Sequence, residues 1–179
     1  MTTTPAASSI VDARLTDARS ADACSTTTDE IAADVHLALA SVDDPEYAGI
    51  SIASLGMIES VVVDQRGRAV IELVPTYAGC PALELIARDV IAAARIVVGV
   101  NEVQLRWRRD LSWTPERLRA DARAALAREF TVVLRRKDGT VRCPVCGSDG
   151  VVDQSEVGPT RCRSVAWCPS CRNPVEVLR

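Results

Sequence analysis

The sequence contains very little histidine, lysine or aromatic side chain. Among 179 residues there is one histidine, His36, one lysine, Lys137, three tryptophans, two tyrosines and one phenylalanine. A carboxylate-bridged di-iron site needs two Glu-x-x-His motifs on facing helices, so a single histidine excludes it. The sequence also lacks a G-x-G-x-x-G loop, the usual dinucleotide fingerprint. We therefore expect no oxygen-activating di-iron centre and no nicotinamide or flavin site of that type.

Long apolar runs are absent as well. No stretch approaches the roughly 20 uncharged apolar residues that span a bilayer. The first ten residues lack the basic and apolar regions of a secretory leader. We expect a cytoplasmic protein with no membrane association, in which cysteines stay reduced.

Charge is distributed unequally along the chain. Residues 1–104 carry 15 acidic and 6 basic residues, whereas residues 105–179 carry 9 acidic and 15 basic residues, which gives net charges of −9 and +6. A basic half can indicate a nucleic-acid surface or attract an acidic protein or ligand. Nucleic-acid binding remains an alternative, although no aromatic residues are interleaved with the arginines for base stacking.

Cysteine is plentiful, with seven residues, five of them in the last 37. Cys143 and Cys146 form one C-x-x-C pair, and Cys168 and Cys171 form a second one 21 residues later. Four thiolates in such pairs suit the tetrahedral preference of zinc, so these four cysteines are the predicted ligands of a structural Zn²⁺. Two disulfides would need an oxidising compartment. Iron in place of zinc would make the module an electron carrier.

The remaining cysteine of this region, Cys162, has no partner of its own in the pattern. Four sulfurs complete a closed zinc site, so Cys162 is either a buried thiol or a fifth, exchanging ligand. The sequence leaves both interpretations open.

Hydrophobic periodicity predicts an α+β protein with a small two-layer sheet-and-helix domain followed by the metal module. Residues 1–27 have the composition of a disordered leader, residues 28–130 form the α/β domain, and residues 131–179 form the metal module. The predicted elements are a helix over 29–40, a loop from 43, antiparallel strands 57–63 and 68–74, a helix over 81–97, a strand at 103–107, a helix from 115 and a hairpin over 131–142.

Cys80 is the candidate functional residue of the α/β domain. It precedes Pro81, which suits the first position of a helix, so we expect Cys80 at the helix cap, where the helix dipole favours a thiolate. The hydroxyls of Thr76 and Tyr77 could donate to it. A small apolar side chain that merely fills space is the structural alternative.

Asp44 and Glu46 flank Pro45 in the turn that ends the first helix. Proline stops a helix, so these acids could serve only as a terminator. Their carboxylates could equally contact a metal or a partner. The sequence alone does not choose between these roles.

Two groups of residues resemble known families. The segments Asp44-Pro45-Glu46, Ile50-Ser51-Ile52, Leu55-Gly56-Met57-Ile58 and Thr76-Tyr77-Ala78-Gly79-Cys80-Pro81 resemble the α/β domain of iron-sulfur assembly proteins of the SufT type. The segments Gly158-Pro159-Thr160-Arg161-Cys162 and Trp167-Cys168-Pro169-Ser170-Cys171-Arg172-Asn173-Pro174 resemble the zinc ribbon of the PaaD family, the D component of the bacterial phenylacetyl-CoA epoxidase system. Together they cover residues 44–179.

The resemblance implies a non-catalytic accessory subunit of the phenylacetyl-CoA epoxidase system in aerobic phenylacetate catabolism. Its expected partners are the oxygenase and the iron-sulfur flavin reductase of that system, whose metal or cluster maturation it would assist, and a homodimer is a further expectation. The implied contacts to transient iron or an iron-sulfur cluster are Cys80, Asp44, Glu46 and Thr76. Relatives commonly have an acid immediately before Leu-Gly, where this chain has Ser54.

Overall fold

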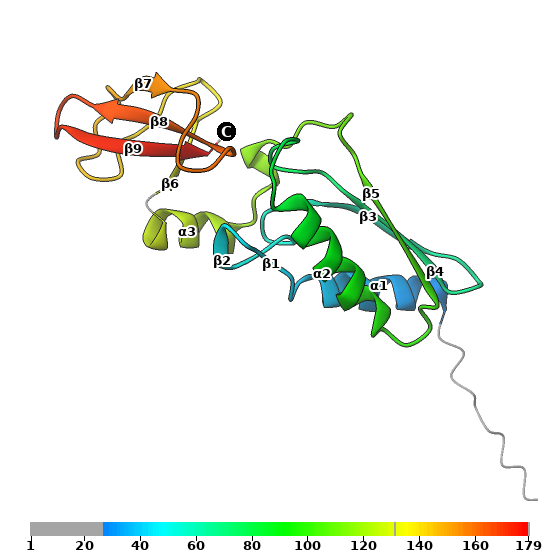
Figure 1. Cartoon of the computed structure of the whole chain (residues 1–179). Helices are drawn as coiled ribbons and strands as arrows, with labels where there is room; N and C mark the ends of the chain where they lie inside the picture. The colour runs from blue at the N-terminus through cyan, green and yellow to red at the C-terminus, as the bar shows by residue number, and fades with distance from the viewer. Residues whose placement is uncertain (1–26, 131, 179) are drawn as a thin grey trace, which may run out of the picture.

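The computed structural model describes residues 27–130 and 132–178 and has the α+β architecture expected (Figure 1). In chain order the first elements are α1 (Thr28–Leu39), β1 (Asp43–Asp44), β2 (Tyr47–Ser51), β3 (Ile58–Val63), β4 (Arg68–Leu73), α2 (Leu83–Arg95) and β5 (Glu102–Trp107). They are followed by the 3-10 helix η1 (Pro115–Arg117), α3 (Ala120–Glu129), β6 (Val132–Leu134), β7 (Val152–Ser155), β8 (Arg163–Cys168) and β9 (Asn173–Leu178). The leader predicted over residues 1–27 lies almost entirely outside the described residues.

The first sheet has the order β3-β4-β5, with α1 and α2 on one face (Figure 1). Strands β3 and β4 pair antiparallel, as predicted, and Gly67 supplies a φ of +74° in the turn between them. Strand β5 lies parallel to β4, so β4, α2 and β5 form a crossover unit. Alternate residues of β4, namely Ala69, Ile71 and Leu73, point into the helix-covered core.

Helix α1 begins with a capping box that was not among the predicted features. Thr27 Oγ1 accepts from the Glu30 backbone N–H at 3.3 Å, and Glu30 Oε2 accepts from the Thr27 N–H at 2.7 Å. Ile31, Val35 and Leu39 form the buried stripe of the helix, and His36 is exposed, as expected for a surface residue. No helix among the described residues is both long and apolar enough to span a bilayer.

Four predicted elements differ from the structure. The predicted loop at 43 contains the hairpin β1–β2, and the predicted helix over 81–97 begins only at Leu83. Thr114 caps the short η1 instead of a long helix, and α3 starts separately at Ala120. The predicted hairpin over 131–142 was wrong, because β6 pairs in parallel with the distant β9 and only a turn around Gly139 remains. Local patterns did not encode these long-range pairings.

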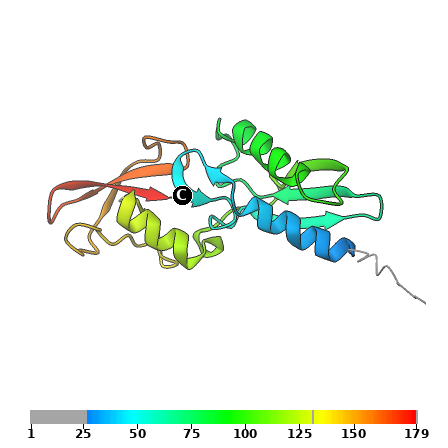
Figure 2. The same cartoon turned by 90° about the horizontal axis from the view of Figure 1, so that it is seen from below.

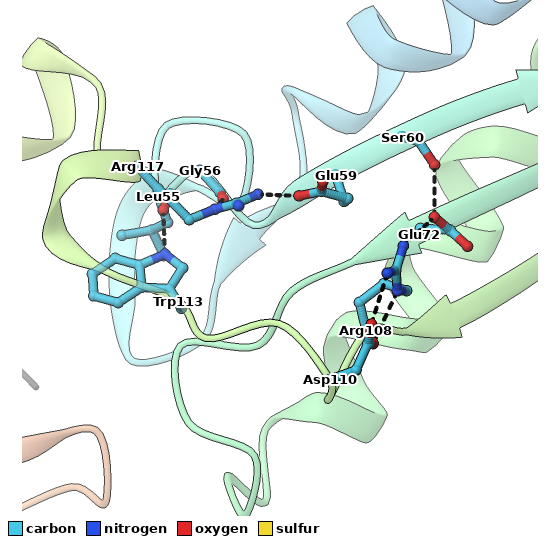
Figure 3. Close-up of polar contacts among 9 residues, drawn as sticks. All are labelled: Leu55, Gly56, Glu59, Ser60, Glu72, Arg108, Asp110, Trp113 and Arg117. Carbon is cyan, nitrogen blue, oxygen red and sulfur yellow. Dashed lines mark hydrogen bonds and ion pairs between the residues drawn. The ribbon is translucent and has the colours of Figure 1, made fainter.

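The segment around Gly56 holds η1 against the sheet (Figure 3). The Trp113 indole N–H donates to the Leu55 carbonyl at 2.8 Å, and Arg117 Nε donates to the Gly56 carbonyl at 2.7 Å. A Cβ at position 56 would collide with the Arg117 backbone oxygen, and φ there is +68°. Glycine is therefore required in the Leu55-Gly56 pair by the close approach of Arg117.

The second sheet has the order β6-β9-β8-β7 and forms the ribbon. Figure 2 shows the hairpin β1–β2 between this sheet and the first one. The ribbon has a small core of its own, formed by Val141, Cys143, Ala166, Cys168, Val175 and Val177. Other ribbon residues belong to the main core of the α/β part, namely Val132, Cys162 and Leu178. The two parts thus share apolar packing across the boundary predicted at 130/131.

Candidate functional site

Cys143, Cys146, Cys168 and Cys171 come together at one end of the ribbon, and we refer to them as the cysteine cluster. Their sulfur atoms all lie within 4.8 Å of one another, with 3.6 Å between Cys143 and Cys171 and 3.5 Å between Cys146 and Cys168. The sulfurs of a tetrahedral zinc site with Zn–S bonds of about 2.3 Å are separated by about 3.8 Å. The four thiols carry no disulfide. This donor set fits a zinc ion, with no position left over for a substrate.

Both C-x-x-C pairs fold into the same turn. The backbone N–H of Gly147 donates to the Cys143 carbonyl at 3.0 Å, and that of Arg172 donates to the Cys168 carbonyl at 2.8 Å. The residue after each pair has a positive φ, +74° at Gly147 and +60° at Arg172. Glycine adopts this conformation freely, whereas arginine does so at a cost, so the second turn is held by its surroundings.

Two thiols of the cysteine cluster have pKa values shifted in opposite directions. The backbone N–H of Cys171 donates to the Cys168 sulfur and lowers the pKa of that thiol below its usual value. At Cys146 the lowering by the Ser148 backbone N–H is outweighed by desolvation and by the neighbouring sulfurs, so its pKa is raised. Cys143 and Cys168 are buried, and Cys146 is exposed. The two turns contact each other through a 3.0 Å hydrogen bond from Ser170 Oγ to Ser148 Oγ. The cysteine cluster therefore has the donor set and the compact arrangement that could hold a metal ion.

A second group of side chains lies where the ribbon meets the hairpin β1–β2. We refer to Asp44, Glu46, Cys80 and Cys162 as the thiol–carboxylate cluster. Cys162 Sγ donates to Glu46 Oε2 at 3.0 Å, and Cys80 Sγ lies 4.0 Å from Glu46 Oε1. Asp44 is 6% exposed and accepts from the Glu46 backbone N–H at 2.8 Å. One carboxylate thus faces two thiols that are 82 positions apart in the sequence.

Cys162 is consequently not a fifth ligand of the cysteine cluster. It is 1% exposed, and its sulfur also contacts the hydroxyls of Thr160, at 3.1 Å, and Tyr47, at 3.5 Å. Of the two interpretations left open by the sequence, the buried thiol is the one that the structure supports. Its surroundings, however, are polar.

Arg163, the residue after Cys162, fixes this arrangement. Its Nε donates to the Tyr47 hydroxyl at 3.0 Å, its Nη1 pairs with Glu176 at 2.8 Å, and its Nη2 reaches the Glu46 carbonyl at 3.4 Å. The guanidinium also lies over the Tyr47 ring, 4.5 Å from its centroid. These contacts orient Cys162 toward the turn between β1 and β2.

The expected thiolate at Cys80 is not what the structure supports. Helix α2 has its N-cap at Ala82, so Cys80 lies two residues before the cap rather than at it. Burial, opposed by the backbone N–H of Ala82 and reinforced by the charges of Glu46 and Asp44, raises the pKa of Cys80. The helix dipole argument was therefore wrong at this position.

The pKa values of Asp44 and Cys162 are also raised. Burial is the main cause at Asp44, whose pKa rises to about 6, with a contribution from the Glu46 charge. At Cys162, burial and the hydrogen bond to Glu46 raise the pKa to about 11. Near pH 7 Cys80 and Cys162 are both protonated, and a metal that binds their sulfurs has to displace the protons.

The other residues singled out in the sequence lie nearby or elsewhere. Thr76 is half-buried in the loop before Cys80, and no hydrogen bond links its side chain to the thiol–carboxylate cluster within the described residues. Ser54 is not in this cluster: its hydroxyl donates to Asp121 Oδ2 of α3 at 2.6 Å. An acid at position 54 would face the Asp121 carboxylate here.

A cavity of about 630 Å³ lies away from both clusters, between η1 and the ribbon. Arg135 and Asp153 line it and form an ion pair of 2.7 Å across its wall. None of the nucleophilic or metal-ligating cysteines reaches this cavity.

Tyr47, Arg163 and the role of Cys162 in the thiol–carboxylate cluster were not predicted from the sequence. Cys162 was visible as a cysteine without a partner, but Glu46 is 116 positions away in the sequence and no local pattern links them. The cluster exists only because the ribbon packs against the hairpin β1–β2.

Comparison with protein families divides the chain in two. Residues 32–105 match the family described as iron-sulfur cluster assembly protein, and residues 127–179 match the PaaD zinc beta ribbon domain. The thiol–carboxylate cluster combines both matched regions, since Asp44, Glu46 and Cys80 lie in the first and Cys162 in the second.

Individual relatives agree with this division. The putative D component of 1,2-phenylacetyl-CoA epoxidase from Escherichia coli is 34% identical over 149 residues, which cover 79% of this chain and 88% of that protein. An uncharacterised protein of Methanocaldococcus jannaschii is 36% identical over 72 residues, 40% of this chain and 75% of that protein. The crystal structure of a domain of unknown function from Bacillus anthracis has a TM-score of 0.54 and 30% identity, and covers 57% of this chain and 96% of its own.

Proposed function

This chain belongs to the PaaD family, that of the putative D component of 1,2-phenylacetyl-CoA epoxidase, and on that premise we propose that it is a non-catalytic accessory subunit of such an epoxidase system. Its task is to help install iron or an iron-sulfur cluster in a partner, either the oxygenase or the iron-sulfur flavin reductase. We propose the partners, the phenylacetate pathway and the delivered metal together, as parts of one function.

The observation that carries the proposal is the placement of Cys80 beside Glu46. These residues come from separate segments of the part that matches iron-sulfur assembly proteins, and the Cys80 sulfur lies 4.0 Å from the carboxylate. Both side chains are half-buried, so a partner's metal can reach them. A protonated thiol beside a carboxylate suits a cargo that binds and leaves, because the metal has to displace the proton when it binds.

We assign the cysteine cluster a structural role with zinc as the resident ion. The ion would hold the two turns of the ribbon together, and the ribbon would serve as a docking module for the partner. Its four sulfurs complete the zinc coordination, which leaves no position open for chemistry.

The experiment compares the reductase from a wild-type strain with that from a strain that lacks this gene. We expect loss of growth on phenylacetate and a reductase that retains flavin but lacks most of its cluster. Complementation with the Cys80→Ala variant should fail, whereas Cys24→Ala, a thiol outside both matched regions, should restore growth. A reductase and an oxygenase that are fully loaded with metal in the deletion strain would contradict the proposal.

Nucleic-acid binding has no comparable support from the geometry. Several arginines of the basic half form ion pairs within the chain. Arg108 pairs with Glu72 and Asp110, and Arg117 pairs with Glu59 (Figure 3). Arg135 pairs with Asp153. An electron-carrier role would require iron in the cysteine cluster. Colourless protein with one zinc per chain would remove that alternative.

A further inference from the structure

We propose that Cys162 of the ribbon joins Cys80 and Glu46 to form a second, exchangeable metal site for a thiophilic divalent cation such as ferrous iron. The inference rests on the proposed function and deepens it, because it makes the cargo site a product of both parts of the chain. On this view the ribbon supplies a ligand directly, in addition to any docking role.

The geometry around Glu46 carries the inference. Its two carboxylate oxygens face different thiols, Oε2 toward Cys162 at 3.0 Å and Oε1 toward Cys80 at 4.0 Å. A thiolate and a carboxylate oxygen on one tetrahedral divalent ion are about 3.6 Å apart, given metal–sulfur and metal–oxygen bonds of about 2.3 and 2.1 Å. Binding of all three groups to one ion would therefore lengthen the first contact and shorten the second.

The charge of the cluster also favours a cation. Within residues 27–130 and 132–178 no ion pair neutralises the Glu46 carboxylate, because the nearby Arg163 guanidinium pairs with Glu176 and reaches only the backbone carbonyl of Glu46. Asp44 lies beside Glu46 as a second, buried acid. Coordination of the ion by both sulfurs releases one proton from each thiol to solvent, so the net charge of the cluster stays the same.

The exposure of the side chains to solvent increases from one end of the site to the other, as a site that transfers a metal requires. Cys162 is buried at the inner end, and Glu46 and Cys80 are half-buried toward the surface. An ion held by all three would keep its outer side open to a partner's ligand. The cysteine cluster differs in this respect, since it surrounds its ion with four sulfurs from one module.

Strand β8 links Cys162 to the cysteine cluster. Cys162 immediately precedes β8, and the same strand ends at Cys168 of the cysteine cluster.

The test uses Co²⁺ as the probe on full-length protein that already holds one zinc per chain. Zinc binds thiolates more tightly than cobalt, so added Co²⁺ reports on a second site. We expect one equivalent of Co²⁺ with thiolate-to-cobalt charge-transfer absorption. Cys80→Ser, Cys162→Ser and Glu46→Gln should each weaken Co²⁺ binding at least tenfold, and Cys24→Ser should leave it unchanged.

Zinc content and thermal midpoint of each variant show whether the fold persists. A second measurement needs no variant: X-ray absorption at the iron edge of the wild-type protein loaded with Fe²⁺ under anaerobic conditions should show two sulfur ligands. One sulfur ligand, wild-type Co²⁺ affinity in folded Cys162→Ser, or no second metal in the wild type would each overturn the inference. A different result would contradict the proposed function, namely a reductase and an oxygenase that are fully loaded with metal in the deletion strain.

Discussion

The guanidinium of Arg163 lies over the ring of Tyr47 and also donates a hydrogen bond to its hydroxyl, with Cζ 4.5 Å from the ring centroid and Nε 3.0 Å from the oxygen. Arg163 is the first residue of β8 in the ribbon, and Tyr47 is the first residue of β2 in the α/β part. Both side chains are buried. This pair is a buried polar link between the two matched regions, and the Tyr47 hydroxyl also lies 3.5 Å from the Cys162 sulfur.

The first prediction concerns this link. Tyr47→Phe removes the acceptor of Arg163 Nε and leaves a buried N–H unpaired, which should lower the free energy of unfolding by about 1–3 kcal/mol. Denaturant titrations of Tyr47→Phe, Arg163→Met and the double variant form a cycle that isolates the coupling between the two side chains. If the effects of the two substitutions on the free energy of unfolding are additive, the two side chains are not energetically coupled, and the prediction is wrong.

The second prediction concerns the cysteine cluster. Cys168→Ser should lose the zinc that wild-type protein retains, because one of four thiolates is missing. The α/β part should lose stability at the same time, since Val132 and Leu178 of the ribbon lie in its core. Metal analysis and thermal unfolding measure both effects. The matched variant Cys80→Ser should keep one zinc per chain, and equal zinc content in the two variants would refute the assignment.

The third prediction uses the positive φ angles that follow the two C-x-x-C pairs. Arg172 adopts a φ of +60° where the first pair has Gly147, so Arg172→Gly should raise the free energy of unfolding by about 1 kcal/mol. Gly147→Ala should lower it by about the same amount. A Cβ at 147 meets only the Arg142 side chain, at 3.4 Å, so backbone strain dominates this change. Equal stability of all three proteins would contradict the explanation.

The fourth prediction follows from the raised pKa of Asp44. Its folded pKa of about 6 exceeds the ordinary value of 3.8, so the folded state binds a proton that the unfolded state has released. The stabilisation is complete below pH 3.8 and is lost as the pH rises through 6. Asp44→Asn should therefore be more stable than wild type near pH 7.5, by on the order of 2 kcal/mol, with little difference at about pH 4.

Denaturant titrations of both proteins across this pH range measure the effect. Zinc release in acid affects both proteins equally and cancels in the difference. A difference that does not vary with pH would contradict the prediction. A stabilising Asp44→Asn substitution would also indicate that the acid is kept for a role other than folding.

Elements with strong local patterns could be predicted from the sequence. The pairing of β3 with β4 follows from β-branched runs on either side of Gly67, and α2 follows from apolar residues that repeat at helical spacing. The C-x-x-C spacing also predicted which four cysteines come together, because each pair forms its turn locally. The families of both parts were identified from the segments around Cys80 and Cys168.

The rest depends on contacts between distant segments. Nothing near Val132 indicates that β6 pairs with β9, and nothing near Cys162 indicates that Glu46 is its partner. The pKa of Cys80 was misjudged because it depends on the burial of the thiol itself, on the charges of Glu46 and Asp44, and on the exact start of α2. Burial and tertiary pairing are properties of the folded chain, and local sequence patterns do not contain them.

Strand β9 has a further consequence for how the protein is made. It pairs with β8 on one side and β6 on the other, and Leu178 near its end is 1% exposed within the core of the α/β part. That core stays incomplete until residues 173–178 have left the ribosome. Nascent chains stalled before this point should therefore expose the apolar side chains that Leu178 covers in the complete protein.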